Sequence, residues 1–120
     1  MVPLPRFTSV GGIPITDLLT EGQLNALIDR TVKGGAELVN LMGTSAWYAP
    51  GAAAALMVET ILRNQRRILP ISAWLQGEYG LQDIYFGVPV VLGKNGVEEI
   101  IELKLNKKEM DLVKHSAKAV

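Results

Sequence analysis

The stretch Ser45-Ala-Trp-Tyr-Ala-Pro-Gly-Ala-Ala-Ala-Ala-Leu-Met-Val-Glu59 joins an aromatic turn to a helix whose first turns carry small residues. Proline at the first helical position gives up an N–H group that has no partner there, so the helix is predicted to start near Pro50. A helix with so little bulk lets another backbone or a flat ligand come close. The sequence therefore indicates half of a site, whose reactive groups lie elsewhere.

The composition narrows the class of protein. A chain of 120 residues, 48% of them hydrophobic, is expected to form one compact domain over residues 1–120. Its formal net charge of zero argues against a nucleic-acid binder, which needs a basic face. Without cysteine, disulfides and thiolate metal sites are excluded, and a cytoplasmic location fits. The uncharged stretch Leu41–Val58 contains Pro50 and Gly51, so we expect no membrane span.

A long amphipathic helix is predicted to begin after Thr20. Thr20-Glu-Gly-Gln23 fits a capping box, in which the two polar side chains satisfy backbone N–H groups. Apolar residues then recur at steps of three and four and form one stripe, made of Leu24, Leu27, Ile28, Val32, Leu38, Val39 and Met42. Gly34-Gly35 lies inside this pattern, and glycine disfavours helix interiors, so we expect a kink or a break there.

The remaining elements are extended or turns. Val2–Val10 is predicted to be extended, because Pro3 and Pro5 suit an edge strand, and Gly11–Pro14 is predicted to turn. Strands are expected over residues 68–76, 84–92 and 97–105. Gly77–Gly80 has the composition of a turn, and Asn95-Gly96 between two apolar runs is a strong hairpin signal. Glu99 interrupts the alternation of the last strand, which indicates a bulged or frayed start.

The C-terminal helix has a clear start signal. Asn106 can cap it and Glu109 stands at the third helical position, while Met110, Val113 and Ala117 form a narrow apolar stripe. Together these elements predict an α+β fold, with a twisted, largely antiparallel sheet packed by helices on one side.

The chain offers little for catalysis. The single histidine, His115, falls off the apolar stripe of its helix, so a surface position is the simpler interpretation. Glu98, Glu99 and Glu102 lie on one predicted strand without a further ligand, so we predict no metal site. The glycine pairs do not follow the dinucleotide-binding pattern. We therefore predict no catalytic residue and no metal ligand in this chain.

Two aromatic residues stand at the helix entry. Trp47 and Tyr48 are interpreted as core or interface residues, and the alternative is the wall of a pocket. The start of a helix favours anions, because free N–H groups point outward there. Ser45 and the N–H groups around Ala46 could meet a carboxylate or another polar ligand atom.

At these residues the chain resembles a known family. Gly43-Thr-Ser-Ala-Trp-Tyr-Ala-Pro-Gly-Ala-Ala-Ala, then Arg66-Arg-Ile-Leu-Pro, then Gly77-Glu-Tyr-Gly-Leu-Gln-Asp-Ile-Tyr-Phe-Gly-Val-Pro-Val-Val-Leu-Gly-Lys-Asn-Gly96 resemble the C-terminal half of the lactate/malate dehydrogenase family. Val2-Pro-Leu-Pro-Arg-Phe7 and Ser116-Ala-Lys-Ala119 fit as well. The Ser-Ala-Trp-Tyr-Ala-Pro version is similar to the lactate-dehydrogenase-like malate dehydrogenases of bacteria, whereas lactate dehydrogenases tend to carry Tyr-Thr-Ser in this turn.

The resemblance implies a substrate-binding domain. It implies that the catalytic histidine, its aspartate partner, the substrate-gripping arginines and the NAD-binding Rossmann domain lie upstream of Met1. It implies NAD-dependent oxidation of malate, a small dicarboxylate, to oxaloacetate, with this chain inactive alone. Ser45 and Ala46 would line the substrate side, Ala46 leaving room for the second carboxylate, and Pro50 would lie against the nicotinamide. The partners implied are the N-terminal Rossmann half and further copies in a dimer or tetramer, with an apolar, small-residue face left open on this half.

Two other functions stay open at this point. The chain could be a non-catalytic assembly or binding module that reuses the same scaffold. The whole protein could also act on lactate or another 2-hydroxy acid, since the residue that selects the dicarboxylate is expected upstream.

Overall fold

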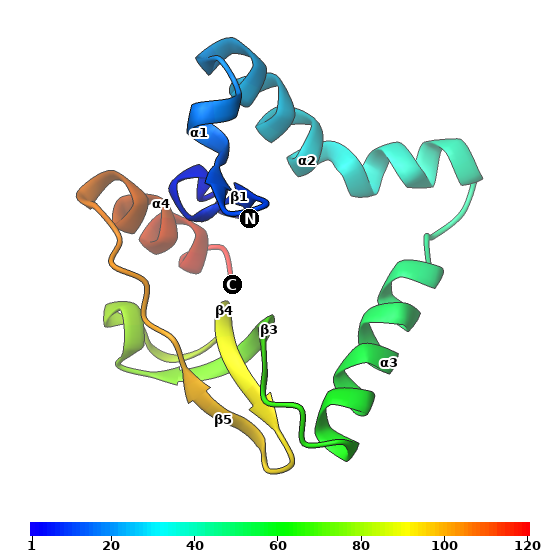
Figure 1. The fold of residues 1–120 in the computed structure, drawn as a ribbon, viewed down its shortest axis with the longest axis vertical. Coiled ribbons are helices and arrows are strands. Elements are labelled where there is room, and N and C mark those ends of the chain that lie inside the picture. The colour runs from blue at the N-terminus through cyan, green and yellow to red at the C-terminus, as the bar shows by residue number, and fades with distance from the viewer. The chain divides into compact units, whose positions relative to one another are not determined.

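The computed structural model describes residues 1–120, and the chain divides into two compact units, Met1–Trp47 and Tyr48–Val120. The first unit holds the short 3-10 helix η1 (Pro5–Phe7), strands β1 (Ser9–Val10) and β2 (Ile13–Pro14), and helices α1 (Ile15–Leu18) and α2 (Glu21–Met42) (Figure 1). The second unit holds α3 (Tyr48–Leu62), β3 (Arg67–Gln76), η2 (Glu78–Gly80), β4 (Gln82–Gly93), β5 (Gly96–Ile100) and α4 (Lys107–Ala117).

The start of the first unit is more folded than expected. Residues 5–7 form a helical turn, so a fully extended Val2–Val10 is wrong. Pro5 begins that turn, where its fixed φ suits a first helical position. The turn predicted over Gly11–Pro14 is confirmed at Gly11-Gly12, where both glycines have positive φ and connect β1 to β2 as an antiparallel hairpin, but Ile13 and Pro14 form β2 itself. Ile15, which follows directly, is buried.

Helix α2 begins as predicted. The Thr20 N–H donates to the Gln23 side chain at 3.0 Å, and the Gln23 N–H donates to the Thr20 hydroxyl at 3.4 Å. The helix then continues through Gly34 and Gly35, so a break there is wrong, although its ribbon bends along its length in Figure 1. Arg30 and Glu37 form a bidentate ion pair across this stretch, with two nitrogen–oxygen distances of 3.2 and 3.0 Å. The two residues of that pair lie on either side of Gly34 and Gly35, the residues of α2 with the lowest helix propensity.

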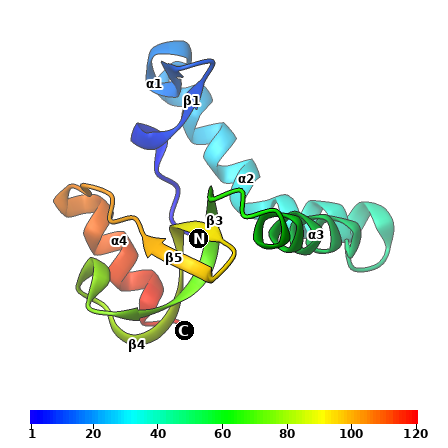
Figure 2. The ribbon, with the colours of Figure 1, turned by 60° about the horizontal axis from the view of Figure 1, so that its bottom comes forward.

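The second unit is built around a three-stranded antiparallel sheet of order β3-β4-β5, to which Figure 2 gives a second view. β3 and β4 match the predicted strands, and Gly93–Gly96 turns the chain from β4 into β5 as expected. Pro70 of β3 faces Pro89 of β4. The Pro89 carbonyl accepts from the Ile101 N–H at 2.9 Å, so its backbone groups point away from β3. The backbone groups of Pro70 point to the open edge of β3, where a missing N–H costs no hydrogen bond between strands.

The last strand is shorter than predicted. β5 ends at Ile100 rather than at Leu105. Its register with β4 shifts where Val91 faces Glu99 and Leu92 faces Val97, so the predicted bulge is confirmed and Glu98 is the extra residue. Beyond Ile100 the Ile101 N–H still donates to the Pro89 carbonyl of β4, but the Ile101 carbonyl and the Leu103 N–H bond to the Tyr79 hydroxyl.

The core of the second unit lies on the inner face of this sheet. Leu75 and Val90 are fully buried, and the cluster also contains Ala73, Tyr79, Val88 and Leu92. Helix residues complete it, namely Met57 and Ile61 from α3 and Met110 from α4. Asn106 and Glu109 form the predicted capping box at the start of α4, with hydrogen bonds of 2.8 and 3.0 Å. The α+β class and the antiparallel sheet are thus as predicted.

Candidate functional site

The candidate functional residues lie in two consecutive stretches of sequence: residues 44–47, which end the first unit, and the first turns of α3, which begin the second. Gly43 ends α2 in the left-handed conformation, with φ of 68°, and its N–H donates to the Val39 carbonyl at 2.9 Å. Glycine suits this position because it carries no Cβ to oppose a positive φ. The chain then leaves the helix axis, and residues 44–47 adopt no regular structure before α3 begins.

The three residues predicted to contact ligands all lie in this part of the chain. Ser45 is exposed and Ala46 is half-buried, both in the irregular segment at the end of the first unit. Pro50 is exposed in the first turn of α3, in the second unit. The helix starts at Tyr48, two residues before the predicted start. Pro50 still falls among the first positions of the helix, where a missing N–H removes no intrahelical bond.

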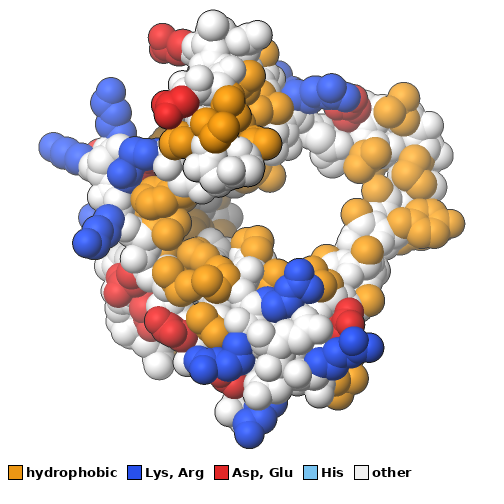
Figure 3. Space-filling view, viewed as in Figure 1, with side chains coloured by type: hydrophobic (Ala, Val, Ile, Leu, Met, Phe, Trp, Pro, Cys, Tyr) orange, Lys and Arg blue, Asp and Glu red, His pale blue; other side chains and the backbone are white.

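Helix α3 has two different halves. Its C-terminal half packs on the sheet, where Thr60 is fully buried and its hydroxyl donates to the Leu56 carbonyl at 2.7 Å. Its N-terminal half leaves Ala52, Ala53, Ala54 and Ala55 exposed, as the open small-residue flank was expected to be. Hydrophobic side chains follow this helix on the right of Figure 3. A helix that is apolar on all sides is typical of one covered by other protein.

The aromatic pair at the helix entry is not part of the core of this chain. Trp47 is 58% exposed and Tyr48 is 76% exposed. The interpretation of these rings as core residues is therefore wrong for the chain by itself. An interface and a pocket wall remain as their possible roles, because both leave the rings open until another segment covers them.

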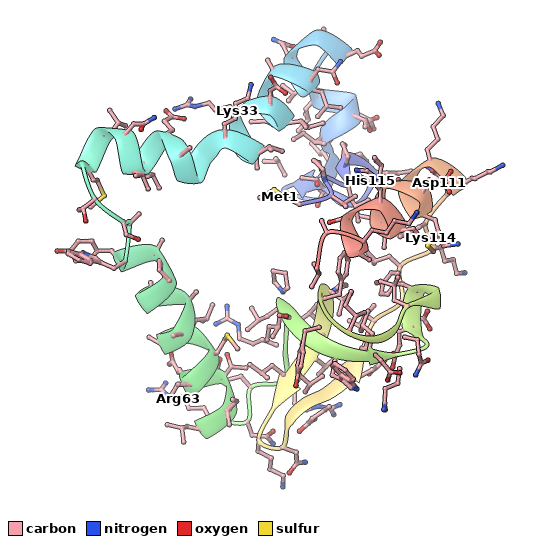
Figure 4. The ribbon with its side chains drawn as sticks, turned by 180° about the vertical axis from the view of Figure 1, so that it is seen from behind. Met1, Lys33, Arg63, Asp111, Lys114 and His115 are labelled. Atoms are coloured by element: carbon pink, nitrogen blue, oxygen red, sulfur yellow. The ribbon has the colours of Figure 1, made fainter.

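The other candidates for chemistry lie elsewhere in the sequence. His115 is exposed on α4, near Asp111 and Lys114, all three labelled in Figure 4, so the surface interpretation is confirmed. No group of three or more His, Cys, Asp or Glu side chains is placed to hold a metal ion. No helix combines the length and the apolar composition that crossing a membrane requires.

One buried polar arrangement escaped the sequence analysis. Tyr79 sits in η2 with a positive φ of 55° and is only 6% exposed. Its N–H donates to the Glu102 carboxylate at 2.8 Å, and burial raises the pKa of its hydroxyl. The neighbouring Glu78 carboxylate accepts the Gln76 N–H at 2.7 Å, which lowers the pKa of Glu78. The signal available was Gly77-Glu-Tyr-Gly80, but turn composition does not reveal that the tyrosine points inward.

A second feature was missed on the outer face of the sheet. Trp74 of β3 and Tyr85 of β4 face each other in register, and their ring centroids lie 4.9 Å apart. Both rings are partly exposed beside a shallow hollow that also includes Glu78 and Glu99. Alternation along a strand indicates only which residues share a face, and the strand register that makes Trp74 and Tyr85 neighbours could not be read from the sequence.

This chain is similar in sequence to a known family and to several known proteins. The family model for the alpha/beta C-terminal domain of lactate/malate dehydrogenase matches residues 2–120. A malate dehydrogenase of Cytophaga hutchinsonii is 62% identical over 120 residues, which is 100% of this chain and 38% of that protein. A malate dehydrogenase of a Roseiflexus species is 61% identical over 121 residues and is covered to 39%.

Solved structures give the same result for the fold. The malate dehydrogenase from Salinibacter ruber matches with a TM-score of 0.95 and 54% identity, over 98% of this chain and 39% of that one. The enzyme from Aeropyrum pernix matches with a TM-score of 0.94 and 43% identity, over 98% of this chain and 40% of that one. This chain therefore spans about two fifths of the length of the relatives it matches.

Proposed function

The chain belongs to the lactate/malate dehydrogenase family, matching its alpha/beta C-terminal domain, and from that premise we propose that it forms one wall of the substrate site of an NAD-dependent malate dehydrogenase. The observation that carries the proposal is the exposed small-residue start of α3, which directly follows in sequence the segment that holds Ser45 and Ala46. Such a surface accepts a close neighbour, and the relatives named malate dehydrogenase are longer than this chain.

The substrate side is assigned to the segment before α3. The exposed Ser45 hydroxyl can donate to or accept from a polar substrate atom. N–H groups in the first turn of α3 have no partners within the helix and favour a carboxylate. Ala46 ends in a methyl group, so it leaves room for the second carboxylate of malate. The proposed substrate is therefore a small dicarboxylate.

The cofactor side is assigned to Pro50. NAD, when bound, accepts the hydride that malate gives up on oxidation. The exposed Pro50 ring and the alanines that follow offer a flat apolar surface, which fits a nicotinamide ring and not a phosphate. No glycine-rich phosphate loop occurs in this chain, so the phosphates and the proton-transfer groups are assigned to the N-terminal Rossmann half. That half is the proposed partner.

Further copies of the protein are the second proposed partner. Helix α2 has 22 residues and none of them is buried, although it carries the predicted apolar stripe. Leu27, Val32 and Leu38 of that stripe are between 43% and 50% exposed. Apolar stripes of this length normally pack on another element. We therefore include assembly into a dimer or tetramer in the proposal.

The decisive experiment separates the chain from its partner half. The chain alone is expected to show no malate oxidation, and adding the separately produced N-terminal half is expected to restore NADH formation. Turnover by the chain alone would contradict the proposal. Association of the two halves without any turnover would favour the non-catalytic assembly module.

One substitution, paired with a control, tests an assigned residue in the full-length protein. Ala46→Leu fills the space assigned to the second carboxylate, so it is expected to raise the KM for oxaloacetate more than the KM for NADH. Ala36→Leu, an exposed alanine on α2 away from the site, is the matched control for added bulk. A preference for pyruvate over oxaloacetate in the unsubstituted protein would identify lactate as the substrate instead.

A further inference from the structure

The tip of the β4–β5 hairpin carries a pair of residues with chemistry of its own. Gly93 and Gly96 pair across the turn, and Lys94 and Asn95 between them are exposed. The chain has five asparagines, at positions 25, 40, 64, 95 and 106, and Asn95 is the one followed by glycine. Gly96 has no Cβ to shield its backbone nitrogen, and its φ of 87° is one that glycine adopts readily.

We propose that Asn95 is a site of spontaneous deamidation and isoaspartate formation. The Gly96 backbone nitrogen loses its proton and attacks the Asn95 Cγ. A bond forms between these atoms, the bond from Cγ to Nδ2 breaks, and ammonia leaves, which gives a five-membered succinimide. One water molecule then opens the ring at either carbonyl carbon and yields aspartate or isoaspartate. The net reaction consumes one water and releases one ammonia, without oxidation or reduction.

The geometry leaves the reacting amide accessible. The Asn95 Nδ2 donates to the Glu98 Oε1 over 3.4 Å, a long hydrogen bond that holds the amide weakly. Solvent reaches the side chain, so water for ring opening is at hand. The other four asparagines precede residues with side chains, whose Cβ atoms hinder the approach of the following nitrogen.

A second asparagine slows this reaction. Asn64 follows the end of α3, in the left-handed conformation with φ of 47°, and its Oδ1 accepts the Lys94 N–H at 3.0 Å. This bond ties the hairpin tip to a residue 30 positions earlier in the chain. A tied turn visits fewer of the conformations that bring the Gly96 nitrogen onto Cγ. Asn64 therefore acts as a positioning residue that sets the rate.

The product would alter the hairpin. Glu98 is the bulged residue of β5, its side chain is 17% exposed, and it pairs with Arg66 at 3.1 Å. Its carboxylate lies over Gly93, in the space where a Cβ at that position would stand. Deamidation replaces the amide donor beside it with a second carboxylate, and isoaspartate adds a methylene to the main chain of a two-residue loop. Both changes favour opening of the Gly93–Gly96 pair.

The test uses the full-length protein, kept in mildly alkaline buffer and digested at intervals. Mass spectrometry follows the gain that replaces NH by O, and enzymatic methylation detects isoaspartyl groups. Both signals are expected on the peptide that holds Asn95 and to be lost in Asn95→Gln. If that peptide keeps its mass while a free peptide of residues 91–99 deamidates under the same conditions, the folded hairpin protects Asn95 and the proposal is wrong.

The role of Asn64 is tested separately. Asn64→Ala is expected to speed deamidation several-fold, whereas Asn64→Asp keeps the acceptor oxygen and is expected to retain the slow rate. Asn40→Ala, an exposed asparagine in the first unit, is the matched control and should leave the rate unchanged. An unchanged rate in a folded Asn64→Ala protein would overturn the assignment of Asn64.

Discussion

The hydroxyl of Tyr79 accepts a hydrogen bond from the backbone N–H of Leu103 at 3.0 Å, across 24 residues of sequence. The same hydroxyl donates to the Ile101 carbonyl, so one buried side chain bonds two backbone groups in the segment that follows β5. The path that leads the chain from the sheet to α4 therefore depends on this residue.

Removing that hydroxyl should weaken the second unit. Tyr79→Phe leaves the Leu103 N–H and the Ile101 carbonyl without their partner, which is expected to cost about 1–3 kcal/mol of unfolding free energy. Urea denaturation measures it. Tyr85→Phe, whose ring is exposed on the outer face, is the matched control. Equal stability of the two variants would show that the hydroxyl contributes nothing.

The same residue predicts a loss of stability at alkaline pH. Burial raises the pKa of Tyr79 in the folded state above the ordinary value of about 10. The neutral hydroxyl therefore contributes its full stability below about pH 10 and loses it as pH rises through the higher folded-state pKa. The difference in unfolding free energy between the wild type and Tyr79→Phe should be constant at neutral pH and shrink in this alkaline range. A difference independent of pH up to the most alkaline condition would contradict the prediction.

Thr60 allows packing to be separated from hydrogen bonding. The residue is fully buried, and its hydroxyl donates to a carbonyl of its own helix. Thr60→Val keeps the volume and should change the unfolding free energy little, because the Leu56 carbonyl keeps its helical environment. Thr60→Ala removes buried atoms and should be clearly destabilising, by about 1 kcal/mol or more. Thermal unfolding of both variants makes the comparison, and a valine variant as unstable as the alanine variant would show that loss of the hydroxyl, common to both, accounts for the destabilisation.

A substitution at Gly34 can distinguish the stability of α2 from its contact with a partner. A Cβ built on Gly34 meets nothing within 4 Å, so Gly34→Ala should stabilise α2 by roughly 0.5–1 kcal/mol in this chain. If a partner backbone lies against this turn, as the proposed assembly requires, the same change should weaken assembly. Circular dichroism and light scattering measure the two effects. Gly43→Ala is the control, since its φ of 68° opposes a side chain and the substitution should destabilise.

Local signals predicted most of the fold. Both capping boxes rest on residues three positions apart, and the hairpin at Asn95 rests on two adjacent residues, so each could be read directly. The end of β5 could not, because it is decided by Tyr79, which lies more than 20 residues away in sequence. The glycine pair in α2 misled for a different reason: the low helix propensity of two residues is a weak signal within a helix of 22 residues.

For the candidate site, the sequence predicted where the residues lie but not what each of them does. The sequence located Ser45, Ala46 and Pro50 at the entry to α3, and the structure leaves Ser45 and Pro50 open to solvent. Their roles remain predictions, because the groups proposed to complete the site belong to another part of the protein. The contact between Trp74 and Tyr85 could not be predicted, because it depends on the register in which β3 and β4 pair.

The facing prolines of β3 and β4 give the hairpin a built-in check on its alignment. Neither proline nitrogen can donate a hydrogen bond, and in the native alignment neither position requires a donor between β3 and β4. A shift of β3 by one residue relative to β4 would turn the backbone of Pro70 toward β4, where its missing N–H would cost one hydrogen bond between the strands. The same shift would move Leu75 from the interior to water. The prolines and the buried face of β3 therefore each select the native alignment of this hairpin.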